Sequence, residues 1–248
     1  MEEPLSDGWL CGPDRGGPHH VPVSSTTDPS ATDPGTTDHS GLTTLGPLAQ
    51  LRAGRLGRRL PQLLGGLVLY GISMAMLVRA NLGLDPWDVL HQGLTHYLSL
   101  SFGTVTIVVG AVVLLLWIPL RQKPGLGTVS NVIVIGLAAD LGLWLIVTPD
   151  DLLVRVLMMV SAVVLNGMAG AIYIGSQLGP GPRDGLMTGL SARTGRSLRL
   201  VRVSIEIMVL IVGVLLGGTV GIGTVLYALA IGPLVQFFLR FATVRLPR

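Results

Sequence analysis

Six stretches of the chain are apolar for long enough to cross a lipid bilayer, and polar or glycine-rich segments separate them. They cover about 60–79, 102–120, 126–147, 153–175, 200–217 and 222–240. A membrane-spanning helix needs about 20 mostly apolar residues, and the backbone of a span must satisfy its own hydrogen bonds because lipid offers none. The pattern therefore predicts an all-α membrane protein with six transmembrane helices.

The apolar part of the chain is also an internal repeat. Residues 59–143 align with residues 155–239 without a gap, at a constant offset of 96 positions, and 24 of the 85 aligned positions are identical. The shared glycine, proline and aspartate residues are the most informative, because each marks a specific backbone requirement. They include Gly71/Gly167, Gly83/Gly179, Pro86/Pro182, Asp88/Asp184, Gly93/Gly189, Gly125/Gly221 and Gly127/Gly223. Such duplication is typical of proteins that build a pathway through a bilayer.

The basic residues predict how the repeats are oriented. Residues 51–248 contain 16 Lys and Arg residues, and 14 of them fall on one side if both termini are cytoplasmic, leaving Arg79 and Arg155 on the other. The positive-inside rule therefore predicts a multi-pass protein of the bacterial cytoplasmic (inner) membrane with both termini in the cytoplasm. Because each repeat contains three spans, the membrane repeats 55–147 and 152–245 are expected to be inverted relative to each other.

Composition separates this membrane domain from the first 50 residues. The whole chain is 49% hydrophobic and 12% charged, with a mean hydropathy of +0.64, which excludes an ordinary soluble domain. Residues 1–50 instead contain seven acidic residues against Arg15, together with seven of the 16 prolines. This composition predicts a disordered acidic Pro/Thr-rich tail. Cys11 is the only cysteine, so no disulfide can form within the chain.

A segment too short and polar to cross the membrane lies between the first and second spans of each repeat. Residues 81–94 and 177–190 each predict a turn containing a glycine, Gly83 or Gly179, followed by a short helix of about three turns. The predicted N-cap, first and third helical positions are Asp85, Pro86 and Asp88 in one copy and Gly181, Pro182 and Asp184 in the other.

Two interpretations of these segments remain open. Helix capping alone accounts for the shared proline and for Asp88 and Asp184, because an acidic residue in the first turn complements the helix dipole. Alternatively, both short helices dip inward, and their glycine turns and positive ends converge between the repeats. The first copy, with Trp87, is apolar enough to do so, whereas the second carries Arg183 and Arg193 and would lie more easily at the interface.

Three segments resemble the YczE/YitT-type bacterial integral membrane proteins: 82–94, the Ser-Phe-Gly-Thr sequence at 101–104, and the Pro-Gly-Leu-Gly-Thr turn at 124–128. The resemblance covers about 55–240, and its most specific element is Pro-Trp-Asp at 86–88. The chain has a long N-terminal tail and no counterpart of the soluble C-terminal domain of the YitT branch, so it is expected to lie nearer the YczE-like branch. The resemblance implies a multi-span fold and carries no site residue onto this chain.

Polar residues inside the spans are candidates for function, because their burial in lipid is costly. Asp140 lies in the third span and its repeat equivalent is Gln236; it is either a pathway or ion-coupling group or a structural hydrogen-bonding group. Glu206 follows Arg202 by four residues, which predicts an ion pair along one helix face. Interhelical hydrogen bonds are expected for a further set, Tyr70, Asn131, Asn166, Tyr173 and Tyr227. The histidines lack metal-site spacing, so no metal site is expected.

The motifs of common enzymes are missing from the sequence, which has no His-Glu-x-x-His, Gly-x-Ser-x-Gly or Walker loop. We therefore expect a protein that is not an enzyme, uses no cofactor and does not bind nucleic acid. The repeat favours permeation of a small molecule or ion, with Asp140, Gln236, Asp88 and Asp184 as candidate pathway residues. The alternative is a non-catalytic scaffold or regulatory partner that docks another protein through the arginine-rich cytoplasmic loop 183–202.

Overall fold

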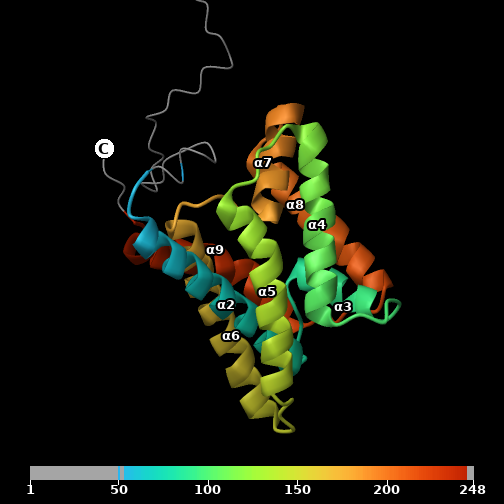
Figure 1. The fold of residues 1–248 in the computed structure, drawn as a ribbon. Helices are drawn as coiled ribbons and strands as arrows, with labels where there is room; N and C mark the ends of the chain where they lie inside the picture. Colours follow the sequence, from blue (N-terminus) through green and yellow to red (C-terminus); the bar gives the residue numbers. More distant parts are fainter. Residues whose placement is uncertain (1–49, 51–52, 245–248) are drawn as a thin grey trace, which may run out of the picture. The chain divides into compact units, whose positions relative to one another are not determined.

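All regular structure in the described residues, Gln50 and 53–244 of the computed structural model, is helical (Figure 1). The helices are α2 (Leu56–Ala80), α3 (Pro86–Thr95), α4 (Phe102–Leu120), α5 (Leu126–Leu145), α6 (Leu152–Gly175), α7 (Pro182–Thr194), α8 (Leu198–Leu215) and α9 (Ile222–Ala242). The all-α prediction is confirmed for these residues. The tail predicted over 1–50 lies almost entirely outside them.

The helices reproduce the offset of the sequence repeat. Helix α2 begins at Leu56 and α6 at Leu152, 96 positions later, and the same offset relates the starts of α3 and α7, of α4 and α8, and of α5 and α9. Each predicted apolar stretch forms a helix, and each predicted short segment forms a short one. Below, two residues separated by this offset are called equivalent.

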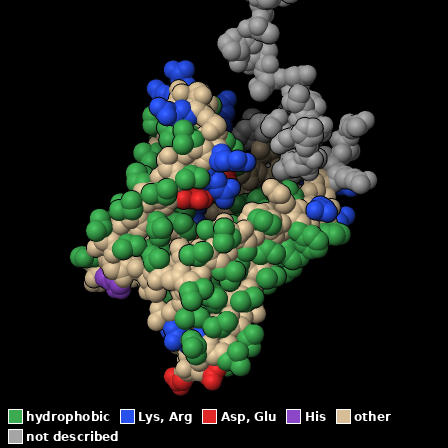
Figure 2. All heavy atoms as spheres, turned by 180° about the vertical axis from the view of Figure 1, so that it is seen from behind, with side chains coloured by type: hydrophobic (Ala, Val, Ile, Leu, Met, Phe, Trp, Pro, Cys, Tyr) green, Lys and Arg blue, Asp and Glu red, His purple; other side chains and the backbone are tan. Residues whose placement is uncertain are grey.

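Five of the helices are long and apolar enough to cross a membrane: α2, α4, α5, α6 and α9. Helix α8 has 18 residues and carries Arg199, Arg202 and Glu206, so its composition falls short of that of the other five. Large apolar side chains cover the outside of the described residues, as the face in Figure 2 shows. Trp144 is 80% exposed and Ile118 71% exposed. Such a surface would promote aggregation in water and is favourable in lipid, as in a membrane protein.

Helices α2 and α6 form a central antiparallel pair that is joined at both ends by arginine. The Arg59 side chain donates hydrogen bonds to the backbone oxygens of Ser176 at 2.8 Å and Gln177 at 2.6 Å. Its equivalent, Arg155, donates to the backbone oxygens of Ala80 and Asn81, both at 2.8 Å. The last carbonyls of a helix have no partner within the helix, and in both cases the arginine satisfies them. The two acceptor pairs are themselves equivalent.

The turns before the short helices pack across to the other repeat. Gly223, at the start of α9, donates its backbone N–H to Leu82 O at 2.8 Å, and Gly127, at the start of α5, donates to Leu178 O at the same distance. The neighbouring turn residues Gly83 and Gly179 have φ angles of 117° and 127°. Glycine is required there, because only glycine adopts this conformation readily. The backbone requirement inferred from the shared glycines is therefore confirmed at both turns.

Candidate functional site

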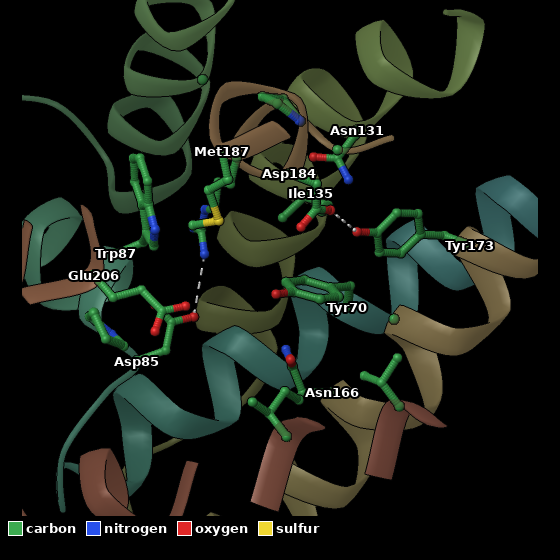
Figure 3. A pocket seen from close by; sticks show the side chains of 18 of the residues that line it. Tyr70, Asp85, Trp87, Asn131, Ile135, Asn166, Tyr173, Asp184, Met187 and Glu206 are labelled. Carbon is green, nitrogen blue, oxygen red and sulfur yellow. Dashed lines mark hydrogen bonds and ion pairs between the residues drawn. The ribbon is translucent and has the colours of Figure 1, made fainter. Parts of the chain in front are cut away.

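A cavity of about 410 Å³ lies between the two repeats. Its walls come from α2, α4 and α5 of the first repeat and from α6, α8 and α9 of the second, together with the N-terminal ends of α3 and α7 (Figure 3). Most small-molecule sites are concave pockets of about this size, roughly 300–1,000 Å³, with a few polar groups. The cavity is therefore the candidate site in the described part of the chain.

The two short helices begin at this cavity, and their first turns meet there. Each starts with a proline after the predicted N-cap, and both Pro86 and Pro182 line the cavity. Arg183 of α7 reaches across to α3, where one guanidinium nitrogen lies 3.5 Å from Asp85 Oδ2 and another 3.5 Å from Asp88 Oδ1. Convergence of the two turns, one of the two interpretations of the sequence, is thus present in the structure.

Capping also operates at α3, so the two interpretations are compatible. Asp85 accepts the backbone N–H of Asp88 at 2.8 Å, as expected for an N-cap. Asp88 is fully buried directly behind it, and its Oδ1 lies 3.2 Å from His91 Nδ1. The other oxygen of Asp88 has no hydrogen-bond partner among the described residues. Asp88 is therefore a buried carboxylate that depends on Arg183 for its counter-charge.

Burial controls the protonation of this cluster. Desolvation raises the pKa of Asp88 to about 6, although the Arg183 charge opposes the shift. Desolvation and the neighbouring Asp88 also raise the pKa of Asp85. Desolvation and the Arg183 charge lower the pKa of His91 to about 3, so this imidazole is neutral near pH 7. The cluster therefore carries two acids and one permanent cation.

The opposite wall presents a second carboxylate among aromatic hydroxyls. Asp184 of α7 accepts a hydrogen bond of 3.3 Å from the Tyr173 hydroxyl, and Asn131 lies beside it (Figure 3). Burial raises the pKa of Asp184, while Arg202 and Tyr173 act in the opposite direction. The Tyr70 ring meets that of Tyr173 edge to face, with centroids 6.1 Å apart.

Polar residues of the central helices connect the two repeats beneath the cavity. The Tyr227 hydroxyl donates to Asn166 Oδ1 at 2.9 Å, and Asn166 Nδ2 donates to Ser73 Oγ at 2.8 Å. The hydroxyls of Tyr227 and Tyr70 are 3.4 Å apart. The predicted interhelical bonds are confirmed for Asn166 and Tyr227, and both residues also line the cavity.

The cavity is closed along one side by the contact between α4 and α5, here called the α4–α5 seam. Glycines allow this close approach, because a Cβ atom on Gly103 would lie 2.0 Å from Gly136 O, and one on Gly136 would lie 2.5 Å from Ile107. Asp140 of α5 stabilises the seam by accepting hydrogen bonds from the backbone N–H of Gly103 at 2.7 Å and from the Ser101 hydroxyl at 2.5 Å.

The equivalent contact between α8 and α9, the α8–α9 seam, is open. These helices pack together far less than α4 and α5 do. Gly232, equivalent to Gly136, has no atom within 4 Å of an added Cβ. Arg199 and Glu206 stand where the first repeat has Gly103 and Gly110. Glu206 accepts the predicted ion pair from Arg202 at 3.0 Å, and both residues line the cavity. Because the exposed Gly232 and Gln236 also line it, the cavity opens between α8 and α9.

Residues 57–240 match the family described as "Family of unknown function (DUF6198)". The chain belongs to this family.

Three relatives agree with the match. The chain is 41% identical over 185 residues to an uncharacterized protein of Haemophilus influenzae, covering 75% of this chain and 84% of the relative. It is 30% identical over 177 residues to the uncharacterized membrane protein YczE of Bacillus subtilis, covering 70% and 82%. The uncharacterized protein YyaS of Bacillus subtilis is 24% identical over 178 residues, covering 70% and 89%. The YczE-like resemblance is thereby confirmed, and no solved structure matches.

The structure brings together only part of the set of candidate residues predicted from the sequence. Asp184 and Gln236 line the cavity, whereas Gly83 and Gly179 form the turns behind it and Asp88 lies behind Asp85. Asp140 is not among the lining residues, and its carboxylate is occupied at the start of α4. Within the described residues no group of three His, Cys, Asp or Glu residues could hold a metal ion.

Sequence reasoning missed the central role of Arg183, which it assigned to a cytoplasmic docking loop. The repeat alignment held a usable signal, because Arg183 is equivalent to Trp87, which lies in the short helix that is apolar enough to dip inward. Inverted repeats bring equivalent positions together near their symmetry axis. The alignment of the two repeats could therefore have suggested that the Arg183 guanidinium contacts the Trp87 ring.

Proposed function

We propose that this protein is a transporter that moves a small polar molecule through the cavity between its repeats. In this proposal α8 is the sixth span, and the chain forms two inverted three-span repeats in the bacterial cytoplasmic membrane. The side chains of α8 support its role as a span. Val203, Ile207 and Ile211 are exposed on its outside, whereas Arg202 and Glu206 line the cavity. Charged residues in spans normally face such interiors.

The distribution of connections supports an orientation with both termini in the cytoplasm. The α4–α5 and α7–α8 connections lie at the top of Figure 1, and the α5–α6 connection lies at the bottom. The upper connections carry the basic residues, including Arg121, Lys123 and Arg196, whereas the lower one carries Asp150 and Asp151. The positive-inside rule assigns the upper end to the cytoplasm.

The contrast between the two seams carries the transport proposal. The glycines and Asp140 of the closed α4–α5 seam lie in the half of the bundle away from the cytoplasmic end, because α4 begins there. The open α8–α9 seam lies in the opposite half, because α8 begins at the cytoplasmic end. A cavity closed on one side by one repeat and open on the other through its equivalent is the arrangement expected of an inward-open transporter. If the α4–α5 seam opened and the α8–α9 seam closed, the cavity would open toward the outer side of the membrane.

Cysteine labelling tests this exchange without knowledge of the substrate. In a Cys11→Ser background, Val109→Cys places a thiol on the α4 wall of the cavity. We expect a membrane-impermeant maleimide to label it from the cytoplasmic side in inverted vesicles. Adding Val203→Cys and Gly232→Cys, equivalents of the touching Ile107 and Gly136, allows a disulfide to close the α8–α9 seam. Oxidation should then move the labelling of residue 109 to the outer side.

Two results would refute the transport proposal. The cavity would be a static feature if position 109 is labelled from neither side, or from the same side before and after oxidation. An exposed double-cysteine pair at Leu115 and Ile118 on α4 controls for effects of oxidation on labelling in general.

A docking role for loop 183–202 is the second candidate. Arg193, Arg196 and Arg199 are exposed at the cytoplasmic end in the proposed orientation, where an acidic protein or anionic headgroups could contact them. Arg183 is directed into the cavity and takes no part in such a face. Capture of a stoichiometric partner by the wild type but not by an Arg196→Gln/Arg199→Gln variant would favour this alternative.

A further inference from the structure

The ion pairs of the cavity leave one carboxylate without a cation in contact with it. Four acidic side chains lie at the cavity or directly behind it. Arginine partners lie beside three of them: Asp85 and Glu206, which line the cavity, and Asp88 behind Asp85. The fourth is Asp184, and among the described residues no Lys, Arg or His nitrogen lies within 4.0 Å of its carboxylate. Arg202 acts on Asp184 only from beyond this distance and is itself paired with Glu206. A carboxylate removed from water without a counter-charge in contact with it is costly. The cavity therefore favours a positively charged guest near Asp184.

The side chains around Asp184 suit an organic cation better than a metal ion. The hydrogen bond that Asp184 accepts from the Tyr173 hydroxyl is long, at 3.3 Å, and the rings of Tyr173 and Tyr70 pack edge to face. Tyr227 also lines the cavity, and its hydroxyl lies 3.4 Å from that of Tyr70, so three tyrosines contribute to the cavity walls. Aromatic faces attract ammonium groups, and tyrosine hydroxyl oxygens can accept their hydrogen bonds.

Trp87 indicates a second feature of the guest. Its side chain is 6% exposed and lines the same cavity, and its indole Nε1 has no hydrogen-bond partner among the described residues. A buried indole N–H normally has an acceptor. Asp85 and Asp88 are already paired with Arg183, and neither carboxylate accepts a hydrogen bond from the indole N–H. A ligand that carries an oxygen acceptor would satisfy this N–H.

We propose that the cavity binds a small organic ammonium compound that also carries a hydrogen-bond acceptor. Its ammonium group lies between Asp184 and Tyr173, and its acceptor faces Nε1 of Trp87. The claim that this compound is a transport substrate rests on the proposed function, whereas its binding can be measured separately. An anionic guest is disfavoured, because both cavity arginines already serve carboxylates and the four acids outnumber them.

Binding to the purified full-length chain in detergent tests the proposal. The probes are choline and ethanolamine, with 3,3-dimethyl-1-butanol as the uncharged isostere of choline, ethylamine as ethanolamine without its acceptor, and propionate as an anion. We expect both aminoalcohols to raise the midpoint of thermal unfolding, and the isostere and propionate to have no effect. Asp184→Asn should weaken binding of the aminoalcohols by about tenfold or more, the loss expected for one charge-assisted contact. Asp150→Asn, an exposed acid outside the cavity, is the matched control.

The Trp87→Phe variant isolates the acceptor. It should weaken binding of ethanolamine and leave binding of ethylamine unchanged. Equal binding of choline and its uncharged isostere to the wild type would overturn the proposal even if the Asp184 variant does not fold. Binding of propionate alone, or of no probe, would overturn it as well. Uptake into proteoliposomes separates the two claims: binding without uptake supports this site and opposes transport, whereas seam exchange without aminoalcohol binding supports transport and removes this substrate class.

Discussion

The guanidinium carbon of Arg183 lies 5.0 Å from the centroid of the Trp87 ring, and these two residues occupy the same position in the two repeats. In the proposed inverted-repeat arrangement, this contact lies at the axis that relates the two repeats. At this shared position one repeat carries a tryptophan and the other an arginine, and the cation is attracted to the face of the aromatic ring. The same arginine neutralises Asp85 and Asp88. Arg183 thus holds together the first turns of the two short helices.

We predict that Arg183→Gln destabilises the protein strongly. The substitution leaves Asp85 and Asp88 buried without a counter-charge, and breaking a buried pair typically costs 3–5 kcal/mol. The Arg183 side chain is 26% exposed and its pairs are 3.5 Å long, so we expect about 2–3 kcal/mol, because solvent weakens such pairs. The measurement is the thermal unfolding midpoint in detergent.

Two further variants identify the cause of that loss. Adding Asp85→Asn to Arg183→Gln should recover part of the stability, because it removes one of the uncompensated charges. Arg196→Gln, at an exposed position just after the same helix, should have little effect. Equal destabilisation by the Arg183 and Arg196 variants would show that the cavity ion pairs are not responsible.

We predict a pH-dependent contribution of Asp88 to stability. Burial raises the pKa of this carboxyl from 3.8 to about 6, so the folded protein binds a proton that the unfolded chain releases in this range. The favourable contribution of Asp88 is fully present below pH 3.8 and is lost as the pH rises through about 6. Asp88→Asn lacks this titration. The unfolding midpoint of the wild type should therefore fall relative to that of the variant as the pH rises from about 4 to 7.

The groups facing Asp88 do not reverse the sign of this prediction. Arg183 stays charged, and the lowered pKa of His91, about 3, keeps the imidazole neutral across the window. Asp85 shifts in the same direction as Asp88 and remains in both proteins. Parallel pH profiles for the wild type and Asp88→Asn would contradict the prediction. Asp150→Asn, an exposed acid in the connection between α5 and α6, is the control.

The sequence predicted the positions of the helices well, because their signals are local. Apolar length, the N-cap at Asp85 and the prolines that start the short helices each depend on neighbouring residues alone. The cavity depends on contacts over long sequence distances, and its residues were only partly foreseen. Asp140 was a candidate because it is a single acidic residue within a span, but its hydrogen-bond partners lie 37 and 39 positions away, at the start of α4. Gly103 and Arg199 occupy equivalent positions, so the sequence already indicated that the two seams differ. Only the packed structure shows that one seam is closed and the other open.

We predict that Arg59 and Arg155 each stabilise the central helix pair. Replacing either with Gln removes two hydrogen bonds to the end of the partner helix, and each bond from a charged donor contributes about 1.5–3 kcal/mol at buried sites. Arg59 is fully buried whereas Arg155 is half-buried, so Arg59→Gln should lower the unfolding midpoint more. Arg58→Gln, at an exposed neighbouring position, is the control. Similar midpoints for the Arg58 and Arg59 variants would refute this role.

We predict that Asp140 acts in stability rather than in binding or transport. Its carboxylate caps the start of α4, and loss of such a cap costs about 1–2 kcal/mol. Asp140→Ala should therefore lower the unfolding midpoint moderately and leave choline binding unchanged. Transport lost at unchanged stability would instead restore the ion-coupling role that its position within a span suggested.

The equivalent glycines Gly136 and Gly232 offer the sharpest comparison, because one lies in a closed seam and the other in an open seam. A Cβ at position 136 would lie 2.5 Å from Ile107 and 2.6 Å from Gly103 O, whereas at position 232 it would meet nothing within 4 Å. Gly136→Ala should therefore destabilise the protein by about 1–3 kcal/mol through overpacking. Gly232→Ala should be neutral, or stabilising by up to about 1 kcal/mol, because alanine favours the helix.

Gly232→Leu turns this comparison into a test of alternating access. The leucine fits the open seam, so the unfolding midpoint should stay within a few degrees of that of the wild type, about the effect of 1 kcal/mol in a protein of this size. If the α8–α9 seam must close during transport as the α4–α5 seam is closed here, the same leucine blocks closure and uptake is lost. Cytoplasmic labelling of Val109→Cys would persist in this variant. Full transport activity with leucine at 232 would mean that the α8–α9 seam does not close in the way that its equivalent does.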